Sequence, residues 1–170
     1  MATLLRRFVV LTALMFWQGG FLFYASVVVP IGQEVLDSHK EQGFITQRVT
    51  NYLNLSGAIA LALLAWDIAA SRDKSTWRYS ARWLCWLGML ATLLWLVWLH
   101  PRLDDLLDAT LKDIIEHRSF RAQHRTYLWV STAQWVFGML FAILTLETWR
   151  RADIVETMKA QGPQPLGLNS

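Results

Sequence analysis

The sequence has few cysteines and few charged residues, and it is short. It has one cysteine, Cys85, so it contains neither a disulfide framework nor a CxxC metal or redox motif. Charged residues make up 17% of the 170 positions, whereas soluble domains approach a quarter. The chain is also too short for a second large domain, which excludes Rossmann folds, large barrels and similar catalytic scaffolds.

Hydrophobic side chains are abundant instead. They account for 54% of the chain, aromatic residues account for 13%, and the apolar residues gather in four blocks. Each block is about 20 residues long, the length of helix that crosses ~30 Å of hydrocarbon. Backbone groups find no water in lipid, and the blocks lack the alternating pattern of barrel strands, so all four should be helices. We predict an all-α, four-helix transmembrane bundle with spans at about 8–29, 49–70, 83–100 and 127–149.

The segments outside the spans have their own patterns. Leucine and isoleucine recur at three- and four-residue steps after the third span, with charged residues opposite, which predicts an amphipathic helix over about 102–118 on the outer face. Pro30 and Pro101 should end the first and third spans. Residues 151–170 lose hydrophobic density and are expected to form a flexible cytoplasmic tail, which leaves 1–150 as the transmembrane domain.

Lysine and arginine indicate the orientation of the bundle. The short connection between spans two and three carries four of them, Arg72, Lys74, Arg78 and Arg82, and such cationic loops stay in the cytoplasm. An even number of spans then places both termini in the cytoplasm. We expect an integral protein of the lipid bilayer, in a bacterial cytoplasmic membrane. Orientation also explains the net charge of +3, so nucleic acid is not an expected partner.

The amides within the predicted spans include Gln18, Asn54 and Gln134. An unpaired amide in hydrocarbon costs several kcal/mol, so Gln18 and Gln134 should point inward at partners, with each other as one option. Helices in lipid associate through small residues and interhelical hydrogen bonds, and the second span has a small-xxx-small spacing from Ser56 to Ala60. We interpret these features as structural, with a place on a substrate path as the alternative.

All four histidines fall on the predicted outer side, together with most of the acidic residues. Imidazole and carboxylate are ordinary ligands of divalent metals, so a cluster of His124, His100, His39 and Glu34 is a candidate metal site. No HExxH spacing supports it, and solvated histidines are the competing interpretation. A b-type haem, or a quinone, held between His100 and His124 is a lesser alternative.

Catalytic motifs are missing from the sequence. Ser131 and Thr132 follow His124 closely, but neither an elbow motif nor oxyanion glycines accompany them. The sequence therefore predicts a protein that is not an enzyme.

Several motifs resemble those of a known family. The Gly20, Phe21 and Phe23 group, the exit from the first span at 27–30 and the small residues around Gly57 resemble the opening half of the small four-span family named for transmembrane protein two-hundred-and-five. Phe120 followed by His124 is similar to its later half, and the resemblance implies that His124 is the histidine that matters. More distantly, the architecture is similar to the membrane domain of the copper-resistance D permeases. The family's activity is unsettled, so the resemblance supports the fold and leaves the chemistry open.

Two functions are compatible with this pattern. In the first, the outer cluster captures a small solute or a divalent metal ion, which would be the cofactor or cargo. In the second, the protein is a non-catalytic subunit or scaffold that binds another membrane protein or a copy of itself.

Overall fold

The structure is a computed structural model of the chain. It describes residues 1–36, 39–71, 73, 75–104, 107–108, 113–114 and 117–161, and the side chains of these residues except those at 39–40, 100–104, 107–108, 113–114 and 117–124.

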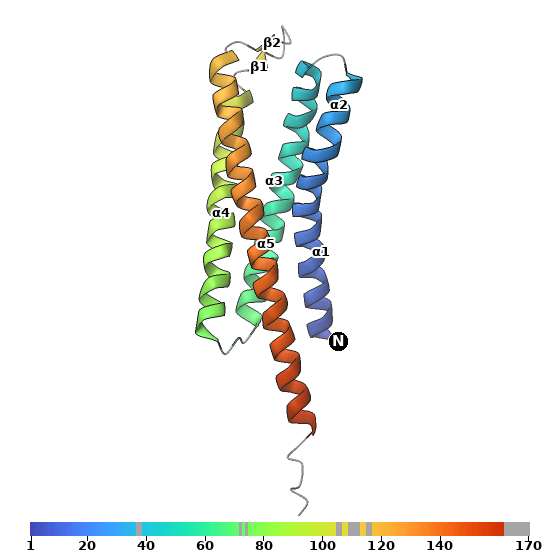
Figure 1. The fold of residues 1–170 in the computed structure, drawn as a ribbon, viewed down its shortest axis with the longest axis vertical. Helices are drawn as coiled ribbons and strands as arrows, with labels where there is room; N and C mark the ends of the chain where they lie inside the picture. The colour runs from blue at the N-terminus through green and yellow to red at the C-terminus, as the bar shows by residue number, and fades with distance from the viewer. Residues whose placement is uncertain are drawn as a thin grey trace, which may run out of the picture.

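Four helical columns stand side by side (Figure 1). The first comprises α1 (Ala2–Phe23), the π-helical turn η1 (Tyr24–Val28) and α2 (Val29–Val35), and the others are α3 (His39–Ala70), α4 (Thr76–Asp104) and α5 (His117–Gln161). All four columns contain a stretch long and apolar enough to cross a membrane. The predicted all-α four-helix bundle is confirmed.

The bundle has two distinct ends (Figure 1). The end that carries the N-terminus, the α3–α4 connection and the last turns of α5 is called the basal end here (residues 1–8, 66–71, 73, 75–83 and 144–161). The opposite end, with α2 and the α4–α5 connection, is the apical end. Both the start of the chain and the end of α5 therefore lie at the basal end, as an even number of spans requires.

Packing follows the order α1, α3, α4, α5. The helix α5 packs along α4, α3 packs along both α1 and α4, and α1 touches α5 at only a few points. The core between them is formed by large apolar side chains, including Trp17, Leu64, Met89 and Phe141. Outward-facing apolar residues such as Phe16 and Leu94 remain exposed, as expected of a surface that contacts lipid.

Pro30 does not end the first span, contrary to the sequence prediction. A proline lacks the N–H of a helical hydrogen bond and its ring crowds the carbonyl four residues earlier. Here the wider π turn of η1 lies directly before it, and the helix continues as α2 to Val35. The hydroxyl of Tyr24 anchors this turn to α3 by donating to Thr46 Oγ1 at 2.9 Å. Pro101 likewise lies within α4, which ends at Asp104.

The amphipathic helix predicted over 102–118 is not observed in the described part of that range. Instead, α4 ends at Asp104, α5 begins at His117, and two short strands lie between them, β1 (Leu107–Asp108) and β2 (Asp113–Ile114). The strands are antiparallel, with Leu107 opposite Ile114. A seven-residue spacing of apolar residues fits two helical turns, but it also fits two strands joined by a short turn, so periodicity alone did not distinguish them.

The predicted flexible tail is wrong over residues 151–161, because α5 continues to Gln161. Salt bridges within and between helices support this extension. Glu147 pairs with Arg150 and Arg151 one turn later, and Arg7 of α1 binds Asp153. The remainder of the predicted tail, 162–170, lies outside the described residues.

Candidate functional site

The most unusual side chain in the bundle is Asp67, a carboxylate with 0% exposure on α3. It lies one turn before the end of α3 at Ala70 and therefore within the apolar stretch of that helix. A charge in such a position is costly unless it is paired, and ionisable residues inside spans mark functional sites by default. Asp67 is thus the natural centre of a candidate site.

Arg82 of α4 is the first partner of Asp67. Its Nη2 donates to Asp67 Oδ2 at 2.7 Å, and its Nη1 donates to Ser71 Oγ at 2.7 Å. The guanidinium is itself fully buried and lies 5.4 Å from the centre of the Phe141 ring on α5. One side chain therefore ties α4 to both α3 and α5, through charge-assisted hydrogen bonds and a cation–π contact.

Arg6 of α1 is the second partner. Its Nε lies 3.0 Å from Asp67 Oδ1, an ion-pair distance, but neither atom has the geometry of a hydrogen bond. The contact is therefore an ion pair without a hydrogen bond. The side chain of Arg6 keeps 17% of its surface exposed, unlike Arg82. Its Nη1 and Nη2 atoms donate no hydrogen bond to any residue that the structure describes.

The three residues together carry a surplus of positive charge. Two guanidinium groups share one carboxylate, and Ser71 is neutral, so the cluster of Arg6, Asp67, Ser71 and Arg82 has a net charge of +1. The Nε of Arg82 is also buried without a hydrogen-bond partner among the described residues. Guanidinium groups bind carboxylates and phosphates through parallel N–H donors. The cluster, called the basal cluster below, is therefore suited to hold an additional anion.

Two further arginines at the basal end are each paired with one acid. Arg7 donates to both carboxylate oxygens of Asp153, at 2.8 and 2.7 Å, and lies 5.3 Å from the centre of the Trp149 ring. Arg78 binds Asp73 through Nε and Nη2 at 3.0 and 2.8 Å. Because both of these pairs are neutral, the surplus positive charge among the buried side chains that the structure describes lies at the basal cluster.

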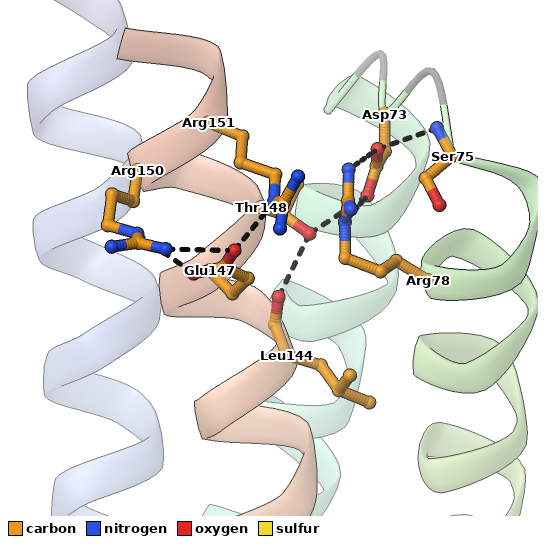
Figure 2. A network of polar contacts seen from close by, with 8 residues as sticks. All are labelled: Asp73, Ser75, Arg78, Leu144, Glu147, Thr148, Arg150 and Arg151. Atoms are coloured by element: carbon orange, nitrogen blue, oxygen red, sulfur yellow. Dashed lines mark hydrogen bonds and ion pairs between the residues drawn. The ribbon is translucent and has the colours of Figure 1, made fainter. Parts of the chain in front are cut away.

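Asp73 is a clamp between the α3–α4 connection and α5 (Figure 2). Its carboxylate accepts hydrogen bonds from Arg78, from the Ser75 N–H at 2.9 Å and from the Thr148 hydroxyl at 3.0 Å. Burial alone would raise the pKa of Asp73, but these hydrogen bonds and the charge of Arg78 outweigh it, so the pKa is lowered. The bond from the Ser75 N–H closes a short turn just before α4.

The predicted metal site cannot be assembled from the described side chains. His39, His100 and His124 lie in the backbones of α3, α4 and α5, but their side chains fall outside the described residues. Glu34 is described and is exposed on α2. Among the described side chains, no group of three His, Cys, Asp or Glu could hold a metal ion. The histidine site and the haem alternative stay predictions.

The intramembrane amides are placed more clearly. Gln18 and Gln134 are buried, at 4% and 7% exposure, as predicted, but neither Nε2 has a hydrogen-bond partner among the described residues. A Cβ at Gly138 would lie 2.9 Å from Gln18 Nε2, so the amide of Gln18 occupies the space that this glycine leaves on α5. Asn54 is half-buried on α3.

The basal cluster is not among the sites predicted from the sequence, although the sequence contains a signal for it. Asp67 is the one acidic residue within the predicted span 49–70, and that alone makes it a candidate. Arg82 was counted among the cations of the connection, because it lies one residue before the predicted third span. The pairing of these residues across three helices depends on helix rotation, which span prediction does not provide.

Comparisons with known proteins add no relative: no family model, no curated protein and no solved structure matches this chain.

Proposed function

We propose that this chain is a non-enzymatic membrane protein that binds an anionic group at the basal cluster. The observation that carries the proposal is the buried charge imbalance, in which Arg6 and Arg82 share the single carboxylate of Asp67. The proposed function belongs to the solute-handling class that the sequence suggested. The solute is an anion bound at the basal end, in place of a metal bound at the apical end.

The chemistry of the cluster supports binding over catalysis. Guanidinium groups stay protonated at all physiological pH values, so Arg6 and Arg82 supply fixed positive charge and do not exchange protons. Asp67 is engaged by both of them. Such a set can hold and orient an anion. Its two side chains of catalytic type are both engaged, Asp67 by the arginines and the Ser71 hydroxyl by the carbonyl oxygen of Ile68, to which it donates.

Access to the cluster is through Arg6. Arg82 is sealed by Asp67, Ser71 and Phe141, whereas Arg6 is partly exposed and retains its Nη donors for a ligand. The two Nη groups of Arg6 form a fork of parallel N–H donors. A ligand with several oxygen atoms on one centre, such as a phosphate, would accept two parallel hydrogen bonds from this fork. The ligand would approach from the basal surface of the membrane.

We further propose that the basal end faces the cytoplasm. The cations of the α3–α4 connection support this orientation, since positively charged short loops remain on the cytoplasmic side. The anion would then be a cytoplasmic solute or a group on the inner leaflet.

The test is a phosphate titration of the purified protein in nonionic detergent, with chloride replaced by phosphate at constant ionic strength. Binding to the native state raises the thermal unfolding temperature in a saturable way. We expect such a rise for the wild type and a loss of at least about tenfold in apparent affinity for Arg6→Gln, because the exposed fork is removed. Arg6→Lys should be intermediate, since it keeps the charge but not the fork.

Arg151→Gln is the matched control. It removes the same charge at the same end from a side chain that is 57% exposed and paired with Glu147. Its phosphate response should equal that of the wild type. Equal responses of wild type and Arg6→Gln, or no saturable response of the wild type, would overturn the proposed function.

A further inference from the structure

A groove on the outside of the bundle leads toward the basal cluster. It lies between α1 and α3, has a volume of about 360 Å³, and is lined by Phe8, Thr12 and Phe16 from α1 and by Ser56, Ile59 and Leu63 from α3. Phe8, Phe16 and Ile59 are more than half exposed, so the groove opens on the surface that faces lipid. Its walls are almost entirely apolar.

The groove and the basal cluster are continuous along both helices. Asp67 follows Leu63 by about one helical turn on α3, and Arg6 precedes Val9, which also lines the groove, by about one turn on α1. The Arg6–Asp67 ion pair therefore lies about one turn beyond Val9 and Leu63, next to the basal end of the groove. From Phe8 to Phe16 the groove covers ~12 Å of helix, close to the ~15 Å hydrocarbon depth of one leaflet.

We propose that the occupant is an anionic phospholipid, with its phosphate on Arg6 and one acyl chain in the α1–α3 groove. This inference rests on the proposed function and names the ligand class. An apolar channel one leaflet deep, with a cation surplus at its membrane-surface end, matches the shape and the charge order of a phospholipid. A water-soluble phosphate would satisfy Arg6 but would leave the groove unfilled.

The charge surplus explains why the lipid should be anionic. A zwitterionic headgroup brings its own ammonium group, which would lie close to both guanidinium groups and be repelled by them. A headgroup with net charge −1 brings the basal cluster to neutrality. The protein should therefore prefer phosphatidylglycerol to phosphatidylcholine with identical acyl chains.

The experiment measures lipid retention by native mass spectrometry of the full chain released from detergent. We expect the wild type to retain phosphatidylglycerol at least about tenfold more than phosphatidylcholine. Arg6→Gln should lose this preference. Two groove-filling variants, Ser56→Leu and Thr12→Phe, should lose phosphatidylglycerol retention but keep the wild-type response to inorganic phosphate, because they leave Arg6 intact.

Ala91→Leu is the control for added apolar volume, since Ala91 is an exposed position on α4 away from the groove. It should retain phosphatidylglycerol as the wild type does. The thermal unfolding temperature of each variant checks that its fold is intact. Because the two groove variants lie on different helices, one of them still tests the inference if the other does not fold.

The outcomes separate the two proposals. If phosphate stabilises the wild type through Arg6 but both groove variants retain phosphatidylglycerol normally, the lipid inference is overturned and the proposed function stands. Equal retention of the two lipids by the wild type overturns the lipid inference as well. If Arg6→Gln changes neither the stabilisation by phosphate nor the retention of phosphatidylglycerol, both proposals fail.

Discussion

At the scale of single residues, the decisive feature is a carboxylate held between two guanidinium groups in an apolar setting. Such an arrangement adds little to stability compared with a well-packed apolar core, because each ion loses its hydration. Removal of one partner is a different matter, since it leaves the other charge buried and unpaired. Asp67 and Arg82 are both fully buried, so this asymmetry should be large here.

We predict that Asp67→Asn destabilises the protein by about 3–5 kcal/mol, because the guanidinium of Arg82 is then left without its counter-ion. Chemical unfolding in mixed micelles, followed by tryptophan fluorescence, measures the change. The double variant Asp67→Asn with Arg82→Gln should recover part of the loss, since it removes both charges. A loss below about 1 kcal/mol for the single variant, the range of surface pairs, would contradict the burial of this pair.

At the scale of helices, α1 and α3 approach each other where Trp17 lies on Gly57. A Cβ at Gly57 would lie 2.6 Å from Cε2 of the indole, which is itself 2% exposed. The glycine therefore provides the space for Trp17, in the way that small residues allow close contact between membrane helices.

Gly57→Ala should cost about 1–3 kcal/mol by overpacking this contact. Gly19→Ala is the matched control, because no atom lies within 4 Å of a Cβ built at Gly19. That change should be neutral or stabilising by up to about 1 kcal/mol, since alanine has the higher helix propensity. Unfolding of both variants under the same conditions gives the comparison, and equal effects would contradict the described contact.

The clamp at Asp73 makes the attachment of the α3–α4 connection to α5 sensitive to acid. Because the pKa of Asp73 is lowered in the folded state, its stabilising contribution is fully present above the unfolded value of about 4 and is lost as the pH falls through the folded value. Asp73→Asn should therefore lower the unfolding temperature at pH 7. The unfolding temperature of this variant should also fall less than that of the wild type as the pH is lowered.

Thermal unfolding between pH 3 and pH 7 measures this effect. Glu156→Gln, at an exposed position of α5, is the control and should keep the pH profile of the wild type. An unchanged profile for Asp73→Asn would show that the hydrogen bonds of Asp73 do not persist in solution.

At the scale of the whole molecule, the orientation in the membrane is open to a direct test. In a Cys85→Ala background, we expect cysteines at Thr76 and Lys159 to react with a membrane-impermeant maleimide only from the cytoplasmic side, because both positions are at the basal end. A cysteine at Glu34, on the apical α2, should react only from outside. The reverse pattern would invert the proposed orientation, and labelling of all three from one side would contradict four crossings.

The sequence was sufficient for the architecture because each span is marked by continuous apolar length, a property that does not depend on the neighbouring helices. The boundaries were less predictable. Pro30 is accommodated by a π turn that no sequence signal announced, and α5 outlasts its apolar stretch through the pairs of Glu147 and Asp153 with arginines. The basal cluster depended on the rotation of three helices about their axes, which spacing along one chain does not fix.

The extension of α5 has a mechanical consequence. From Arg150 to Gln161 the helix projects ~18 Å past its apolar stretch. Among the described residues, its hydrogen bonds to α1 come from Arg7, which donates to Asp153 and to the backbone oxygen of Trp149 just before the projection. A sideways force on the projecting turns is therefore transmitted to α1 through a single guanidinium group. Under load, the narrow seam between α1 and α5 would part before the broad contact between α4 and α5.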